Sequence, residues 1–324
     1  MNNEEGEGPY ERSTILMDTI VRVRIVSSLP QVEVDRACGQ ALSWFERVET
    51  VCSRFETSSE VVRLCARWGE PVVVSPLLFE CLRFALAVAR RTGGAFDPTV
   101  GVRQVERGFN RNYRTGEEVP GTAPQADTSY RDIVLDEARR TVLLRQPVLI
   151  DLGAVAKGLA IDLASRELAQ IAPTGYGIDA GGDLFLAGLG PGGRMWRTGI
   201  PDPQAPGRWL AVLEATDVAI CTSGAYERPS PHLPGEHHIV SPRTGRSPRA
   251  LVQVTVVAPT AMLADALGTA AFVLGPRRGL RLLEREGGVE GLLVTRQGER
   301  LYTERFHCFL AAEPHIDGTV SPRD

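Results

Sequence analysis

One segment near the middle of the chain constrains the fold most strongly. The apolar run Val148-Leu149-Ile150 is followed by the glycine-containing stretch 151–158, Asp-Leu-Gly-Ala-Val-Ala-Lys-Gly, and then by the apolar residues 159–163. This order predicts a strand, a turn and a helix, which together point backbone N–H groups and a helix dipole at an anion. Lys157 adds a positive charge beside the turn. A phosphate could bind here, although an ordinary strand-to-helix junction with a surface lysine explains this stretch alone equally well.

Length, charge and cysteine content set the broad class of the protein. The 324 residues suffice for one large or two ordinary domains with a full core. The formal net charge is −4, and no basic block indicates a nucleic-acid partner. The six cysteines form no C-x-x-C pair and no zinc spacing, so we expect most to be buried and reduced. With no apolar signal segment, no lipidation cysteine and no membrane-spanning run, the sequence predicts a cytoplasmic globular protein.

Hydrophobic periodicity predicts alternating strands and helices. Alternation over 17–25 predicts a strand with Met17 and Thr19 on its buried face, and a spacing of three and four over 32–52 predicts an amphipathic helix. Ser75-Pro76 begins a helix that ends at Gly93-Gly94. Further strands are expected at 133–135, 141–144, 196–203, 209–213, 218–224, 252–258, 289–295 and 300–302, and further helices at 154–171, 261–274 and 279–286.

The ends of the chain and two polar segments have less regular patterns. Residues 1–13 are expected to be disordered and 311–324 to form a loose tail, while 103–127 form an exposed excursion. Residues 95–101 surround a proline with a carboxylate and a hydroxyl, which predicts a loop of defined shape or simply a turn. Residues 177–188 predict a strand interrupted by a double glycine, where a ligand or another backbone comes close, or a bulge.

Asp265 has the most unusual surroundings. It lies in the predicted helix 261–274 beside Leu263 and Leu267, where an unpaired carboxylate is costly. Thr269 lies one turn further along the same face. Two oxygen ligands at this spacing suit Mg²⁺, which takes a few protein oxygens and leaves its other positions to water and phosphate. A carboxylate that caps a neighbouring turn or pairs with an arginine is the open alternative.

Taken together and in order, eight motifs resemble the ApbE family, flavin transferases that move FMN from FAD onto a protein. The motifs span about 17–309 and are Met17-Asp18-Thr19, Ser58-Ser59-Glu60, Phe96-Asp97-Pro98-Thr99-Val100-Gly101, 151–158, Gly181-Gly182-Asp183, 222–228 (Thr-Ser-Gly-Ala-Tyr-Glu-Arg), 238–245 (His-Ile-Val-Ser-Pro-Arg-Thr-Gly) and 264–269 (Ala-Asp-Ala-Leu-Gly-Thr). The resemblance implies an α+β fold of the T-fold-like, two-lobed ApbE type, with mixed sheets and packed helices in one domain over 14–310. FAD and Mg²⁺ are then expected between the two halves.

The resemblance also implies roles for individual residues. Asp265, Thr269 and the backbone carbonyl of Ala156 match the family's magnesium ligands. The positions that line FAD match Met17, Phe55, Ala95, Phe96, Asp97 and Leu159. Lys157 and His238 match positions near the pyrophosphate. The expected catalytic residues are therefore Lys157, His238 and Asp265, with either His238 or Asp265 removing the proton of the attacking hydroxyl.

The implied activity is Mg²⁺-dependent transfer of FMN from FAD to a Ser or Thr hydroxyl of an acceptor protein, with release of AMP. Two alternatives stay open: hydrolysis of FAD to FMN and AMP, and a catalytically silent FAD-binding protein. The chain departs from the family at Asp18, where glycine is usual, and at Ala225 and Ser241, where acidic residues are usual. It contains no Asp-x-x-Ser/Thr-Gly-x-Thr acceptor motif, so self-flavinylation is not predicted.

Overall fold

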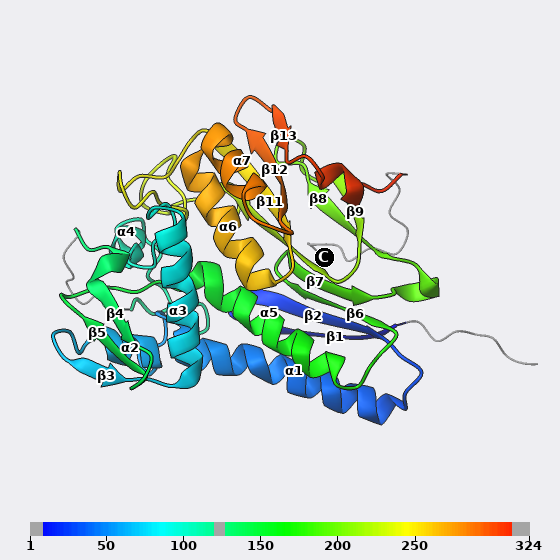
Figure 1. Ribbon diagram of the computed structural model, residues 1–324, viewed down its shortest axis with the longest axis horizontal. Coiled ribbons are helices and arrows are strands. Elements are labelled where there is room, and N and C mark those ends of the chain that lie inside the picture. The colour runs from blue at the N-terminus through cyan, green and yellow to red at the C-terminus, as the bar shows by residue number, and fades with distance from the viewer. Residues whose placement is uncertain (1–8, 120–126, 313–324) are drawn as a thin grey trace, which may run out of the picture.

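A large antiparallel sheet is the centre of the molecule (Figure 1). The computed structural model describes residues 9–119 and 127–312. Eight strands lie in the order β1-β2-β6-β7-β10-β11-β12-β13. They are β1 (Tyr10–Leu16), β2 (Thr19–Val26), β6 (Gly175–Ala180), β7 (Asp183–Gly188), β10 (Val218–Gly224), β11 (Leu251–Ala258), β12 (Glu290–Thr295) and β13 (Arg300–Tyr302).

Helices cover one face of this sheet and enclose the larger core (Figure 1). The long helices are α1 (Gln31–Cys52), α3 (Pro76–Arg91), α5 (Gly153–Ala169) and α6 (Ala261–Leu274), followed by α7 (Pro276–Glu284). Strand β2 turns Val21, Val23 and Ile25 toward them, each at most 1% exposed, because alternate residues of a strand face the same side. Shorter elements complete this part: α2 (Glu60–Cys65), α4 (Gly101–Val105) and a separate sheet of β3 (Pro71–Val73), β5 (Thr141–Leu144) and β4 (Ile133–Asp136).

A two-stranded sheet covers part of the opposite face. Strands β8 (Trp196–Pro201) and β9 (Trp209–Ala215) enclose a second, smaller core with the outward side chains of β7, β10, β11 and β12. In β11, Val256 belongs to the first core and its neighbour Val257 to the second. This continuous apolar strand is therefore explained by burial on both faces.

The α+β class and most of the expected elements are confirmed. Ser75 caps α3 by accepting the N–H of Leu78, and Thr260 caps α6 by accepting the N–H of Leu263. The strand pairs among the described residues are antiparallel, so the expectation of mixed sheets is wrong. Five of the six cysteines are buried free thiols, as expected, whereas Cys308 is exposed.

Three local expectations are corrected. Residues 10–13 belong to β1 instead of a disordered start, because they pair with 22–25 of β2. Residues 177–188 form the β6–β7 hairpin instead of an interrupted strand, because Gly181-Gly182 is its two-residue turn. The excursion begins with the helix α4, which the sequence reasoning did not predict. The expectations for residues 1–8 and 313–324 concern parts of the chain outside the described residues.

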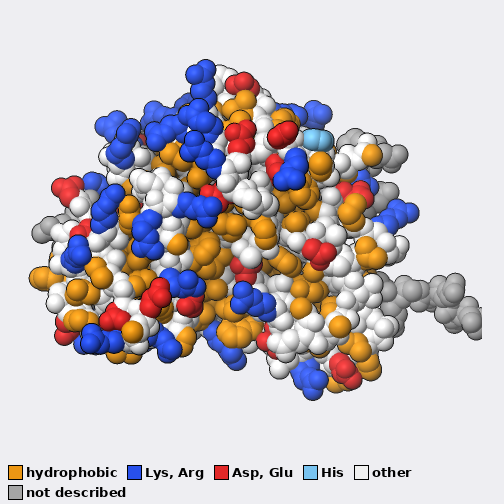
Figure 2. Space-filling view, in the orientation of Figure 1, with side chains coloured by type: hydrophobic (Ala, Val, Ile, Leu, Met, Phe, Trp, Pro, Cys, Tyr) orange, Lys and Arg blue, Asp and Glu red, His pale blue; other side chains and the backbone are white. Residues whose placement is uncertain are grey.

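The surface of the molecule carries a concentration of basic side chains. In the space-filling view, basic side chains gather over α7, where Arg277, Arg278 and Arg281 are exposed (Figure 2). Among the described residues, no helix combines the length and the apolar character needed to cross a membrane.

Candidate functional site

A cleft of about 800 Å³ lies where two hairpins of the large sheet turn. The β1–β2 turn contributes Met17 and Asp18, and the β6–β7 turn contributes Gly181 and Gly182. The start of α5, one face of α6 and the loops around residues 95–113 and 226–240 form the remaining walls. This volume is within the range of small-molecule and cofactor sites.

Both hairpin turns depend on left-handed backbone conformations. Met17 and Asp18 have φ of 53° and 61°, and Gly181 and Gly182 have φ of 67° and 93°. Positive φ at both positions is typical of the tight turns that match strand twist. A Cβ on Gly181 would lie 2.1 Å from Thr19 Oγ1, so the neighbouring hairpin explains this glycine, whereas Gly182 has open space around it and is explained by its positive φ alone.

The first turn of α5 faces the cleft. Asp151 Oδ1 accepts the N–H of Gly153 at 2.8 Å, and no side chain caps the helix at Leu152. Ala154 departs from helical geometry, so the helix begins irregularly beside Lys157. Uncapped N–H groups and the helix dipole favour an anion at such an end. The structure thus confirms the predicted helix and places its N-terminus in the cleft wall, but the strand predicted at residues 148–150 is wrong, because these residues form an irregular segment.

Arg54 contacts residues from several walls of the cleft. It forms a buried ion pair with Asp151, and its Nη2 donates to the carbonyl of Phe109 at 2.6 Å and to Gln104 at 2.9 Å. Its guanidinium also lies 4.0 Å from the centre of the Phe55 ring. The sequence reasoning missed Arg54. Arg54 directly precedes Phe55, which was expected to line the flavin. Because arginine commonly stacks on aromatic rings, this position in the sequence was the available signal for Arg54.

Asp97 shapes the loop that follows α3. Its Oδ1 accepts the backbone N–H and the hydroxyl of Thr99 at 2.9 and 2.8 Å, and its Oδ2 accepts the N–H of Tyr130 at 3.0 Å. Burial raises the pKa of Asp97, and these donors oppose the increase. The predicted loop of defined shape is confirmed. Because both carboxylate oxygens are engaged, Asp97 holds Ala95 and Phe96 in the cleft wall.

Lys157, Asp183 and Asp265 form the charged centre of the cleft. Lys157 is the only lysine in the chain, and its ammonium pairs with Asp183 Oδ2. Asp183 Oδ1 also accepts the N–H of Thr222 at 3.3 Å. Asp183 lies in a motif of the resemblance but was not expected to be a site residue. The only lysine of the chain, partly buried beside the turn, requires a counter-charge, and this requirement was the available signal for Asp183.

The three groups change one another's charge. Burial opposes the charge of Lys157, but the carboxylates of Asp183 and Asp265 outweigh burial and raise its pKa. Burial, together with the carboxylate of Asp183, raises the pKa of Asp265 to about 7, although Lys157 acts in the opposite direction. Two carboxylates beside one ammonium leave the cluster short of positive charge.

The residues expected to hold Mg²⁺ fit a divalent cation. Asp265, Thr269 and Ala156 line the same cleft, and Asp265 Oδ2 is buried without a hydrogen-bond partner among the described residues. A carboxylate oxygen without a partner, in a cleft that Thr269 and Ala156 also line, has the hard-oxygen chemistry that a divalent cation prefers. In the described part of the chain, no group of three or more His, Cys, Asp or Glu side chains is placed to hold a metal ion, so a cation here would depend on Asp265 with uncharged oxygen ligands.

His238 lines the cleft from the loop between β10 and β11. Burial lowers its pKa to about 3, and the neighbouring charge of Arg228 contributes. Its Nδ1 is buried without a hydrogen-bond partner among the described residues. Gln104 donates to its backbone carbonyl at 3.2 Å, and Phe109 meets its ring edge to face at 6.4 Å. His238 is therefore neutral at physiological pH, and a weak base in this state.

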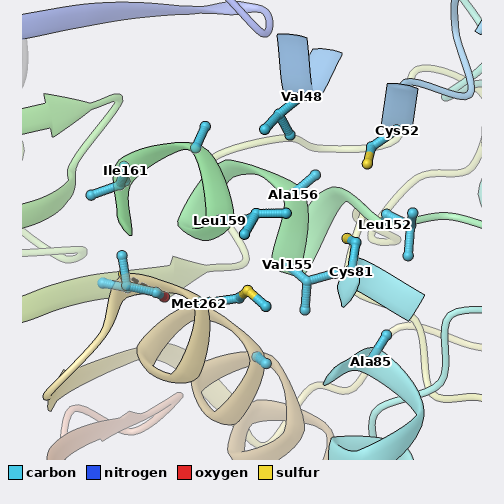
Figure 3. Packing of buried hydrophobic residues seen from close by; sticks show 14 of the residues in the cluster. Val48, Cys52, Cys81, Ala85, Leu152, Val155, Ala156, Leu159, Ile161 and Met262 are labelled. Carbon is cyan, nitrogen blue, oxygen red and sulfur yellow. Dashed lines mark hydrogen bonds between the residues drawn. The ribbon is translucent and has the colours of Figure 1, made fainter. Parts of the chain in front are cut away.

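The cleft brings together almost the whole expected residue set. The residues that line it as expected are Met17, Phe55, Ala95, Phe96, Asp97, Ala156, Lys157, His238, Asp265 and Thr269. Leu159 does not line it: only 9% of this residue is exposed, and it packs in the core with Met262 (Figure 3). The expectation that Leu159 lines FAD has no support in this geometry, because α5 turns that position toward α6.

The three departures from the family pattern differ in their positions. Asp18 is in the cleft, where its carboxylate lies 3.3 Å from Arg228 and aspartate tolerates the left-handed turn. Ala225 and Ser241 are not among the lining residues. The N–H of Ala225 donates to Val252 at 3.0 Å and that of Ser241 to Arg246 at 2.9 Å. Only Asp18 therefore alters the cleft wall directly.

Comparison with known proteins agrees with this arrangement. The family model described as the ApbE family matches residues 17–293. The FAD:protein FMN transferase of Treponema pallidum is 34% identical over 307 residues, covering 88% of this chain and 84% of that protein. The Escherichia coli K12 protein of the same name is 30% identical over 297 residues, covering 87% of this chain and 81% of that protein.

Two solved structures share the fold. The ApbE protein of Thermotoga maritima superposes with a TM-score of 0.81 at 30% identity, covering 93% of this chain and 99% of that one. The flavin transferase ApbE of Vibrio cholerae superposes with a TM-score of 0.80 at 26% identity, with coverage of 93% and 99%. Since the family model spans most of the chain and the relatives match it over most of their length, the chain belongs to the ApbE family.

Proposed function

We propose that this protein is an FAD:protein FMN transferase that moves FMN from FAD to a Ser or Thr hydroxyl of an acceptor protein and releases AMP. The observation that carries the proposal is the Lys157–Asp183–Asp265 cluster, which lies beside the N-terminus of α5 in a cleft of cofactor size. The names of the relatives from Treponema pallidum and Escherichia coli support the same reaction.

Different residues of the cleft would bind the flavin and the pyrophosphate of FAD. The aromatic and apolar wall around Phe55 and Phe96 suits the flavin, and the N-terminus of α5 suits the pyrophosphate. Lys157, held by Asp183, supplies a fixed positive charge for the phosphates. Such preorganised charge is the main protein contribution to phosphoryl transfer.

Asp265, Thr269 and the carbonyl of Ala156 are the residues that would hold Mg²⁺. When bound there, the ion would neutralise negative charge on the pyrophosphate. Mg²⁺ dependence and AMP release are part of the proposal and rest on the donor set of the cleft.

The reaction is a displacement at the phosphorus on the FMN side. The acceptor hydroxyl oxygen forms a new bond to this phosphorus, the bond from phosphorus to the bridging oxygen breaks, and AMP leaves with that oxygen. The hydroxyl proton must pass to a base. Burial lowers the pKa of His238 to about 3, so His238 is a weak base, which leaves Asp265 as the proposed base. His238 then serves as a neutral hydrogen-bonding group in the wall.

Hydrolysis of FAD to FMN and AMP is the second candidate, because the same cleft would act on water instead of an acceptor hydroxyl. A silent FAD-binding protein is disfavoured, since Lys157, Asp183 and Asp265 are all present and face one cleft. The acceptor protein and a cytoplasmic location stay predictions from the sequence.

The test measures AMP and FMN released from FAD with Mg²⁺, with and without an acceptor domain that carries Asp-x-x-Ser/Thr-Gly-x-Thr, together with in-gel flavin fluorescence. A fluorescent acceptor and stoichiometric AMP support transfer. AMP with free FMN and an unlabelled acceptor would support hydrolysis, and bound FAD without AMP would support the silent protein.

Two variants test whether the reaction takes place in this cleft. Asp265→Asn should reduce AMP formation by about a hundredfold or more, because it removes the charged ligand and the proposed base. Asp136→Asn is the control, because it makes the same change at a carboxylate that lies outside the cleft. Near-normal turnover in Asp265→Asn would contradict the assignment of the site.

A further inference from the structure

Among the described residues, no strand pairs with the outer edge of β1, and this edge leads to the cleft. β1 is the terminal strand of the large sheet, and within the described residues it pairs only with β2. Glu11, Arg12, Ser13 and Ile15 are exposed. Free edges are templates for pairing with another chain, and proteins usually cover or blunt them. This edge ends at Leu16, directly before the cleft-lining residues Met17 and Asp18.

The register of β1 and β2 shows which backbone groups face outward. Leu16 and Thr19 flank the two-residue turn, so they form the hydrogen-bonded pair that closes the hairpin. Such pairs alternate along an antiparallel ladder. Thr14 and Arg12 therefore bond to β2, whereas Ile15, Ser13 and Glu11 turn their N–H and C=O groups away from it.

Two exposed isoleucines mark the same end of the edge. Ile15 and Ile20 lie directly opposite each other, and 66% and 48% of these residues are exposed. Directly opposed residues share a face of the sheet, so the pair forms one apolar patch beside the turn. At the turn, Asp18 lines the cleft together with Tyr113.

We propose that an extended segment of the acceptor protein docks on the outer edge of β1 as an added strand and so presents its hydroxyl to the cleft. This inference rests on the proposed function, because only a transferase needs a protein segment at this place. The backbone groups of Glu11, Ser13 and Ile15 supply the hydrogen bonds, and Ile15 with Ile20 supplies an apolar contact. Strand addition of this kind recognises many peptide sequences, because most of its affinity comes from the main chain.

The direction of the added strand predicts which part of the acceptor matters. Every strand pair in the large sheet is antiparallel among the described residues, and an acceptor that continues this pattern runs opposite to β1. β1 runs toward the cleft, so the acceptor strand runs away from it. The reactive Ser or Thr therefore lies at the N-terminal end of the docked segment, and the residues after it occupy the edge.

The principal test replaces Ser13 by proline. Ser13→Pro removes an outward N–H and adds a ring at the edge without removing a hydrogen bond to β2. Ser13→Ala is the matched control, because it removes the hydroxyl but keeps the N–H. With the acceptor domain described above as the probe, Ser13→Pro should raise KM for the acceptor about tenfold, and Ser13→Ala should leave it unchanged. AMP release from FAD without acceptor should not change in either variant.

A second variant avoids any change in the backbone. Ile15→Ser removes most of the apolar contact and should raise KM for the acceptor about fivefold or more, with kcat nearly unchanged. Far-UV circular dichroism and thermal melting establish that each variant is folded. If folded Ser13→Pro and Ile15→Ser both label the acceptor with wild-type KM, the edge is not the docking site. If the wild-type protein neither releases AMP nor labels any acceptor, the proposed function itself fails.

The acceptor provides an independent test of direction. Synthetic peptides that carry the motif are shortened either before or after the reactive residue. Loss of labelling on removal of the residues after it, and tolerance of removal before it, supports the docked orientation. The reverse dependence would overturn it.

Discussion

Lys157 lies between two carboxylates whose surroundings differ. Asp183 has partners on both oxygens, namely Lys157 and the N–H of Thr222, whereas Asp265 Oδ2 has none among the described residues. Asp183 thus engages the ammonium and leaves Asp265 available for another cation. This difference gives the two carboxylates separate tasks, one in positioning Lys157 and one in binding metal.

Because Lys157 is the only lysine, its reactivity can be measured directly. Asp183→Asn removes the nearest negative charge, so the pKa of Lys157 should fall and the fraction of neutral amine should rise. We expect acetylation of Lys157 by an amine-reactive ester at pH 8 to become about fivefold faster or more, measured by mass spectrometry with the N-terminal amine as internal standard. Asp136→Asn, outside the cleft, should leave the rate unchanged, and an unchanged rate in Asp183→Asn would contradict the ion pair.

Among the elements, the contact between α5 and α6 determines the geometry of the proposed metal site, because Ala156 lies on one helix and Asp265 on the other. Gly158 is where the two helices approach most closely, since a Cβ there would lie 2.5 Å from the N and Cα atoms of Met262. Asp162 Oδ1 and Oδ2 accept the first N–H groups of α6, from Ala261 at 2.8 Å and Met262 at 3.1 Å. The close packing around this contact is visible in Figure 3.

Gly158→Ala should force the helices apart. Backbone atoms cannot yield as a flexible side chain does, so we expect a loss of about 2–3 kcal/mol in the free energy of unfolding, measured by urea denaturation, together with weaker Mg²⁺-dependent activity. Gly287→Ala is the control, because a Cβ there meets nothing within 4 Å, and its stability should stay within about 0.5 kcal/mol of wild type. Equal stability of the two variants would refute the close contact.

Asp162 should contribute a distinct pH dependence to stability. Burial raises its pKa to about 6, although the N–H groups of Ala261 and Met262 oppose the increase. Between the unfolded and folded pKa values the native state binds more protons, so this group's contribution to stability falls as pH rises from about 4 to 6. Asp162→Asn should remove about 1.4 kcal/mol of this decline between pH 5 and pH 7.5, measured by urea denaturation at these and intermediate pH values. Parallel pH profiles for the two proteins would contradict the assignment.

At the scale of the whole molecule, the cleft joins segments that are distant in the sequence. Met17 and Asp18 come from the first hairpin, Arg54 and Phe55 from the end of α1, and Asp265 from α6. The large core on one face of the sheet holds the helices, and the smaller core on the other face holds β8, whose residues 198–201 also line the cleft. A ligand that contacts all of these walls should stabilise the fold as a unit.

FAD with MgCl₂ at about a hundred times its dissociation constant should therefore raise the free energy of unfolding by about 2.7 kcal/mol, which corresponds to a thermal midpoint about 4 °C higher. Asp265→Asn should keep any shift caused by FAD alone but lose the further increase caused by Mg²⁺. Differential scanning fluorimetry or calorimetry measures both. A Mg²⁺-dependent increase that persists in Asp265→Asn would place the metal elsewhere.

Local patterns by themselves determined most elements of this protein. The spacing in α1, the proline start of α3 and the threonine cap of α6 depend on neighbours within a few residues, so they are visible in the sequence. The tertiary structure alone decided which of these elements meet. The pairing of Lys157 with Asp183, the stacking of Arg54 on Phe55 and the burial of Leu159 depend on contacts between distant segments. Side-chain periodicity specifies which face of an element is buried, but the partner across that face is set by the packing of the complete chain.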